Sequence, residues 1–450
     1  MMKYFIILIM LIMIFMVSGS MLNILFQNLI LLIFFFFFFE FSFLSYNFID
    51  FCSLQYFYGL DYFSFWMIIL SMWISVLMML ASMKIIKENK FSGMFILTLL
   101  IMLVILIFTF SVLNFLLFYF FFEASLIPIV LVILGWGYQV ERIRAATYLL
   151  MYTMFFSFPF LGGLFYIYYL VDSMDMIILN NGGGVKIINS SCLYMLIMNV
   201  FFVKMPMFLY HMWLPKAHVE APVAGSMILA GVMLKLGGYG MYRSLFLLES
   251  KLSSNSYYLV FSLWGGLCAG FICMRQLDMK SLVAYSSVVH MSLVISGFLS
   301  VELVGVQGAF MMMIAHGLCS SGLFCLVNMI YERTLSRSLI INKGLLVYSP
   351  IMMMMWFFLC IGNMSAPPSL NLISEIFLLI SLIGWESYLF ILLMTILFIS
   401  SCYSLYLFSY TCYGVHMNLY MYNMFSVREY ILILMHLIPL NLLILSFNFF

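Results

Sequence analysis

The sequence predicts an all-α protein that crosses a membrane many times. Of its 450 residues, 66% are hydrophobic and only 8% are charged, whereas soluble domains carry about 25% charged residues. A helix that crosses a hydrocarbon layer of roughly 30 Å needs about 20 apolar residues, and such runs follow one another along the chain with short polar breaks. A water-soluble core is excluded, and a polytopic helical bundle is expected.

Reading apolar runs between polar breaks predicts about fourteen spans. One of them, 113–134, is separated from its neighbour only near Asn114, inside a continuous apolar run. The expected ranges are 4–17, 22–39, 60–83, 92–111, 113–134, 145–170, 192–212, 222–246, 256–274, 280–300, 303–331, 348–384, 388–412 and 429–448.

Proline interrupts two of these ranges in similar ways. Lys204-Met205-Pro206 breaks the seventh span, and Pro367-Pro368 breaks the twelfth. Paired proline-broken spans at corresponding places indicate inverted repeats with the ion path at the breaks, and the spacing suits a five-helix unit. The expected divisions are three spans in 1–90, a first repeat in 91–250, a second in 251–415 and a last span in 416–450.

The cations outside the membrane predict its sidedness, because basic loops stay on one side. Loops after odd-numbered spans hold twelve: Lys84, Lys87, Lys90, Arg142, Arg144, Lys216, Arg275, Lys280, Arg333, Arg337, Lys343 and Arg428. The opposite loops hold four: Lys3, Lys186, Arg243 and Lys251. Of the 18 cations, this leaves Lys204 and Lys235 inside the membrane.

Several partner classes are not indicated. The formal net charge is +2 and the basic residues are scattered, which argues against a nucleic-acid partner. The cysteines never form CxxC, and no GxGxxG occurs, so neither a thiolate cluster nor a dinucleotide site is indicated. The glycine-rich 180–184 stretch lacks the Lys-Ser/Thr of a phosphate loop and is expected to be a linker. We therefore expect no bound nucleotide, flavin, iron or zinc.

Six ionisable residues fall near the middle of the predicted spans. Counting about 1.5 Å per helical residue puts four of them roughly 13 to 20 Å into the layer, and the other two, Lys204 and Glu375, lie at a similar depth. A charge at this depth costs about 2.5 to 3.5 kcal/mol even on the lenient scale. Such residues are expected to face a hydrated interior, to partner one another and to pass protons. They are Glu123, Lys204, Lys235, His290, His316 and Glu375.

Plainer roles remain open for these residues. Glu123 and Lys204 would form a static ion pair if they only held helices together. His290 and His316 would be satisfied core histidines, or they would hold a haem between two helices.

Four other histidines carry weaker expectations. His211 and His218 flank the segment 213–216 near a surface, and either interfacial anchoring or proton uptake and release is open. His416 and His436 have no comparable context and are expected to be incidental.

Five blocks between residues 118 and 375 contain all six buried ionisable residues. They read FYFFFEASLIPIVLVILGWGYQVERIRAATYLLMYT, KMPMFLYHMWLPKAHVEAPVAGSMILAGVMLKLGGYG, RQLDMKSLVAYSSVVHMSLV, AHGLCSSGLFCLVNMIYERTLSR and NMSAPPSLNLISE. Together they resemble the chain 4 family of mitochondrial NADH:ubiquinone oxidoreductase (respiratory complex I), the antiporter-like proton-translocating subunits. Leu277 departs from this pattern, since the family usually has threonine there, which affects only a local hydrogen bond.

The resemblance implies a role for each buried residue. Glu123 would tune the proton affinity of Lys204, and Lys235 would be the central relay. His290 and His316 would be intermediate carriers, and Glu375 would be the terminal carboxylate.

The resemblance also implies partners and a location. The chain would sit among the membrane-arm subunits and lipids of complex I in the mitochondrial inner membrane, with the odd loops on the matrix side. NADH, FMN, iron–sulfur clusters and ubiquinone would be held by other subunits, and this chain would have no redox centre. A stand-alone cation/proton antiporter is the nearest rival; a purely structural scaffold would leave the buried charges unexplained.

Overall fold

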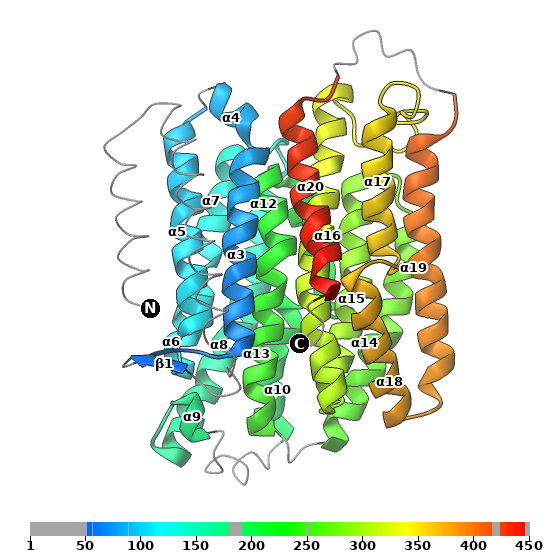
Figure 1. Ribbon diagram of the computed structural model, residues 1–450. Helices are drawn as coiled ribbons and strands as arrows, with labels where there is room; N and C mark the ends of the chain where they lie inside the picture. The colour runs from blue at the N-terminus through cyan, green and yellow to red at the C-terminus, as the bar shows by residue number, and fades with distance from the viewer. Residues whose placement is uncertain are drawn as a thin grey trace.

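The computed structural model describes residues 52–55, 57–88, 90–179, 191–248, 252–415 and 424–445. In this part of the chain the helices stand side by side in one bundle (Figure 1). Ten of its helices are long and apolar enough to cross a membrane. Helices suit this environment because lipid offers no partner to backbone N–H and C=O groups. The predicted all-α polytopic fold is confirmed.

The helices of the first part of the bundle run from α3 to α13. They are α3 (Tyr62–Ala81), α4 (Met83–Lys87), α5 (Ser92–Ser111), α6 (Phe115–Ala124), α7 (Leu126–Trp136), α8 (Arg142–Val171), α9 (Met176–Ile178), α10 (Ser191–Lys204), α11 (Trp213–Glu220), α12 (Val223–Ile228) and α13 (Leu234–Leu248). A short 3₁₀ turn (Tyr210–Met212) precedes α11, and a π-helical turn (Leu229–Met233) joins α12 to α13.

The second part of the bundle runs from α14 to α20. Its helices are α14 (Leu252–Met274), α15 (Met279–Leu299), α16 (Leu303–Thr334), α17 (Pro350–Asn363), α18 (Leu370–Trp385), α19 (Leu389–Cys412) and α20 (Val427–Leu442).

Every predicted span inside the described residues is occupied by helix. The ranges 4–17 and 22–39 lie outside them, so the total of fourteen stays a prediction, as do the five-helix repeats and their boundaries. One element was not predicted: strands β1 (Cys52–Gln55) and β2 (Tyr58–Leu60) form an antiparallel hairpin just before α3.

Both proline breaks appear in the structure. Helix α10 ends at Lys204, two residues before Pro206, and α17 ends at Asn363 before Pro367. Proline has no N–H to donate and disfavours helical geometry in the residue before it. The breaks therefore end helices inside the bundle, where freed carbonyls need other partners.

Candidate functional site: a buried row of ionisable side chains

Lys235 lies at the start of α13, directly after the π-helical turn. Its side chain is fully buried, and its ammonium donates to the carbonyl of Ala230, inside that turn. π-Helical turns interrupt the regular backbone ladder and are frequent at functional sites. An ammonium has three protons to donate, so Lys235 keeps donors for side chains as well.

Side chains from three other helices form a row that begins at Lys235. His316 on α16 places Nδ1 3.0 Å from the Lys235 Nζ, and its ring centroid is 5.6 Å from that of His290 on α15. The Nδ1 of His290 is 3.5 Å from Oε1 of Glu375 on α18. All four side chains are buried. We call Lys235, His316, His290 and Glu375 the relay row.

Helix α16 approaches the π-helical turn closely because of a glycine. A Cβ at Gly317 would lie 3.1 Å from the carbonyl oxygen of Gly231 and from the Leu70 side chain. A larger residue would push α16 away from α12 and α13. Gly317 therefore lets the neighbouring His316 reach Lys235.

The proline break positions the far end of the row. Helix α18 begins at Leu370, so Glu375 falls in its second turn. The side chain of Asn371 bridges the break by donating from Nδ2 to the carbonyl of Gly362, with a distance of 2.6 Å. A carbonyl near the end of α17 thus has a partner, as buried backbone requires.

Tyr403 on α19 belongs to the same site. Its hydroxyl oxygen is 3.2 Å from Nε2 of His290, so both nitrogens of that ring face a polar side chain. Such contacts fix the orientation of a histidine ring. Sequence reasoning missed Tyr403 because a tyrosine inside an apolar run carries no charge that marks it.

Glu123 and Lys204 are arranged differently. Glu123 is next to the last residue of α6, and Lys204 ends α10. Across the described residues they form no ion pair with each other or with another side chain, and both carboxylate oxygens and the ammonium are buried without a hydrogen bond. The Lys204 ammonium lies 4.4 Å from the ring centroid of Phe122, a cation–π distance. The two residues interact electrostatically, but this structure holds no ion pair between them.

His211 and His218, which were expected near a surface, have side chains that are buried within the bundle. They are 2% and 0% exposed; His218 lies on α11, which packs against α8 and α15, and His211 lies in the 3₁₀ turn just before it. His218 stacks on Phe324 at 4.6 Å and is close enough to Lys235 to interact electrostatically with it. His211 stacks on Phe208 at 5.2 Å. The structure thus brings His218 beside the relay row and keeps His211 apart from it.

Two cations counted as loop residues are also buried. Arg243 is 2% exposed and Lys280 is 1% exposed. Arg243 lies on α13, two turns after Lys235, and pairs with Asp61 at 2.6 Å. Lys280 lies in the first turn of α15 and donates to the carbonyl of Ala221, 3.1 Å away. A signal was present for Arg243, since it falls inside the predicted range 222–246.

The remaining histidines take no part in the row. His436 is buried, and its Nδ1 is 2.8 Å from the carbonyl oxygen of Leu432 on its own helix. His416 lies outside the described residues. Within the described ranges there is no group of three or more His, Cys, Asp or Glu side chains that could hold a metal ion.

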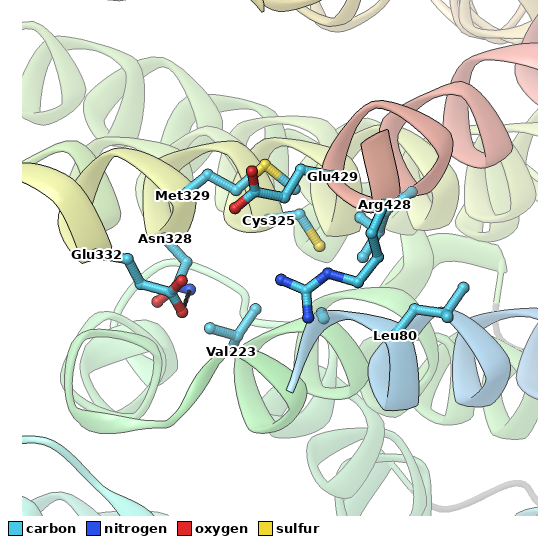
Figure 2. Close-up of a pocket in the computed structure, with 10 residues that line it drawn as sticks. Leu80, Val223, Cys325, Asn328, Met329, Glu332, Arg428 and Glu429 are labelled. Carbon is cyan, nitrogen blue, oxygen red and sulfur yellow. Dashed lines mark hydrogen bonds between the residues drawn. The ribbon is translucent and has the colours of Figure 1, made fainter. Parts of the chain in front are cut away.

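A small pocket lined by both apolar and charged side chains opens at the end of the bundle where α3, α12, α16 and α20 meet (Figure 2). Arg428 points into it from α20, near Leu80 and Val223, and Glu332 and Asn328 occupy another wall. The Asn328 amide donates to Glu332 Oε1 at 2.9 Å. This end carries many of the cations counted on the basic side.

Two family models together match most of the chain up to residue 400. One described as NADH:quinone oxidoreductase/Mrp antiporter matches residues 112–400, and one described as the amino terminus of NADH-ubiquinone oxidoreductase chain 4 matches residues 1–109. The likeness therefore extends well beyond the five blocks between residues 118 and 375.

Individual relatives agree with these matches. NADH-ubiquinone oxidoreductase chain 4 of Ceratitis capitata is 48% identical over 398 residues, 88% of each chain. The protein of the same name from Polypterus ornatipinnis is 41% identical over 409 residues, 90% of this chain and 89% of that one. A solved chain of respiratory complex I from Thermus thermophilus with bound NADH shares the fold, with a TM-score of 0.82 at 21% identity over 95% of this chain and 91% of that one. The chain belongs to the NADH-ubiquinone oxidoreductase chain 4 family.

Proposed function

We propose that this chain is a proton-translocating membrane subunit of respiratory NADH:ubiquinone oxidoreductase. It moves protons through buried glutamate, lysine and histidine side chains, and quinone reduction in other subunits supplies the energy. The observation that carries the proposal is the relay row, in which four buried ionisable side chains from four helices follow one another. Membership of the chain 4 family supports the same function.

The distances decide how each transfer proceeds. Lys235 and His316 are in hydrogen-bond contact at 3.0 Å, so a proton passes directly between them. The 5.6 Å between the His316 and His290 ring centroids calls for a rotation of a ring or for one bridging water. The 3.5 Å from His290 to Glu375 closes to a hydrogen bond with a small side-chain movement.

The first half supplies protons to this row. A carboxylate close to Lys204 stabilises the protonated ammonium, and its withdrawal favours release of the proton. Glu123 is the carboxylate in position to do so. In this scheme Lys204 hands its proton towards Lys235 when Glu123 moves away, and reloads when Glu123 returns. His211 and His218, which no relay-row hydrogen bond engages, are candidates for uptake or release branches.

Placement in the cell follows from the family. The chain lies in the mitochondrial inner membrane among other membrane-arm subunits and lipids, without a nucleic-acid partner. The loops after odd-numbered spans face the matrix, since they carry the excess of basic residues. The segments 91–250 and 251–415 act as the two repeats.

Two rival functions are less well supported. A stand-alone antiporter would need no partner subunits, whereas the relatives are named as one chain of an oxidoreductase. A haem held by His290 and His316 would need open ring nitrogens, but those of His290 face Tyr403 and Glu375. A Soret absorption band in the purified chain would contradict this assignment.

Removing the charge of Lys235, the first residue of the relay row, tests the function. Lys235→Met keeps the length of the side chain and removes the ammonium. In vesicles containing the assembled complex, we expect NADH oxidation by the peripheral arm to persist while the number of protons moved per electron falls. Lys84→Met is the matched control, because Lys84 is exposed on α4. A normal proton-to-electron ratio in the assembled Lys235→Met complex would refute the assignment.

The expectation that this chain binds no cofactor can be tested separately. NADH, FMN, iron–sulfur clusters and ubiquinone belong to other subunits, and this chain binds no nucleotide, flavin, iron or zinc. Elemental analysis of the isolated subunit should find no stoichiometric iron or zinc, and one bound iron per chain would contradict it.

A further inference from the structure

A buried ion pair closes the bundle at the end where β2 and α3 meet. The guanidinium Nη2 of Arg243 is 2.6 Å from Oδ1 of Asp61, and both side chains are buried. Asp61 also caps α3, because it accepts a hydrogen bond from the backbone of Ser64. Arg243 lies eight residues after Lys235, which is about 12 Å along α13. The pair thus stands between Lys235 and this end of the molecule, where α3 begins (Figure 1).

Tyr239 lies midway between Lys235 and Arg243 on α13. Residues four apart lie on the same face of a helix, so Lys235, Tyr239 and Arg243 follow one line along α13. The Tyr239 hydroxyl donates to the carbonyl of Phe110 and accepts from Arg243, each at 3.0 Å. Both its donor and an acceptor position are therefore occupied.

Aromatic rings enclose this line of polar groups. Phe63 stacks on Tyr242 at 4.4 Å, Phe110 meets Tyr239 edge-on at 5.2 Å, and Phe118 lies 5.8 Å from Tyr239. Phe110 and Phe118 are fully buried, and Phe63 is 5% exposed. Close packing of this kind leaves little room for a chain of water molecules.

We propose that Asp61, Arg243, Tyr239 and the surrounding phenylalanines form a proton seal, which blocks a direct route from Lys235 to the nearby membrane surface. The inference rests on the proposed function, because it assigns these residues a role in the same proton path. Arginine does not release its proton in proteins, and buried arginines exclude protons from other pores. With the Tyr239 hydroxyl committed as well, no group on this line passes a proton on. A proton on Lys235 must then leave sideways to His316.

The opposite end offers a matched comparison. Arg333 and Glu429 also form a buried pair at 2.6 Å, and Glu429 also caps a helix, α20. Glu429 of this pair also lines the pocket of Figure 2, together with the charged side chains of Arg428 and Glu332. The two ends share a buried arginine–carboxylate pair, but the aromatic enclosure on the line of Lys235 occurs at the Asp61 end.

Passive proton leak tests the seal without turnover. The complete complex is placed in vesicles, its quinone site is inhibited, a pH step is imposed, and the internal pH is followed with a trapped dye. Arg243→Leu should raise the proton conductance about tenfold, which corresponds to a barrier lowered by about 1.4 kcal/mol. Arg333→Leu should leave conductance at the wild-type value, although it strands a buried carboxylate in the same way.

Milder substitutions keep the test usable if the leucine variants fail to assemble. Asp61→Asn and Glu429→Gln remove one charge each and retain side chains that still cap their helices. The complex with Asp61→Asn should show a raised proton conductance and a lower proton-to-electron ratio, while its rate of quinone reduction stays unchanged. The complex with Glu429→Gln should show neither change.

Two outcomes would overturn the seal. One is wild-type conductance in an assembled Asp61→Asn or Arg243→Leu complex; the other is an equal leak from the variants at both ends, which indicates general loosening. Failure of the proposed function itself would appear elsewhere, as a normal proton-to-electron ratio in Lys235→Met, so the two failures are distinguishable.

Discussion

The two halves of the buried path differ in how their charged groups are connected. In the second half, Lys235, His316, His290 and Glu375 follow one another at short distances. In the first half, Lys204 and the carboxylate oxygens of Glu123 are buried, yet the two residues form neither a hydrogen bond nor an ion pair within the described residues. Connected groups suit passage of protons, whereas a separated carboxylate and ammonium suit control of when a proton is released.

The physical cost of the separation makes this difference informative. A buried charge without a partner is expensive, so a gap between Glu123 and Lys204 is unfavourable unless water or movement relieves it. If the pair alternates between contact and separation, the free energy of leaving the two charges unpaired rises and falls once in each cycle. We therefore interpret the first half as a switch and the second half as a relay.

Removing the switch lysine should have the largest effect. Lys204→Ala deletes the group that loads the path, so most proton pumping by the reconstituted complex should be lost. The complex should still assemble on native gels, and its NADH-oxidising arm should still work. Pumping retained at the normal ratio would remove Lys204 from the path.

Neutralising the switch carboxylate should be nearly as severe. Glu123→Gln keeps the shape of the side chain and removes the charge that holds the proton on Lys204, whereas Glu123→Asp keeps the charge and should be partly tolerated. Dye-monitored pumping in vesicles gives both values. If Glu123→Gln pumped normally but lowered assembly or thermal stability, a static ion pair would be the better interpretation.

The smallest effect is expected at Tyr403. Tyr403→Phe removes a single hydrogen bond to His290, worth about 1 kcal/mol, and leaves the contact between His290 and Glu375 in place. Pumping should fall only slightly, and the midpoint of thermal unfolding should drop modestly. A loss as large as that of Lys204→Ala would make Tyr403 a carrier of protons and not a positioning residue.

Much of this architecture could be predicted because lipid restricts what a chain can do. Apolar length located the helices, and Pro206 and Pro367 located the breaks, since proline has no N–H to donate and disfavours helical geometry in the residue before it. Burial of Lys204, Lys235 and Glu375 followed from depth along each span alone.

The rest depends on which face of a helix meets which neighbour. Hydropathy could not show that a π-helical turn precedes Lys235, that Tyr403 reaches His290, or that α11 folds inwards and buries His218. Arg243 was placed outside the membrane because a single arginine near the end of a span has the same hydropathy whether it faces water or Asp61. The separation of Glu123 from Lys204 likewise depends on side-chain positions, which the spacing of residues along the sequence does not determine.

The double variant Glu123→Gln/Lys204→Ala tests the central claim most directly. If the two residues are one switch, either substitution already disables it, and the proton-to-electron ratio of the double variant should be scarcely lower than that of Lys204→Ala. Residues that act independently would instead give additive losses. A double variant that falls well below both singles, or that restores pumping towards the wild-type ratio, would contradict a single switch formed by Glu123 and Lys204.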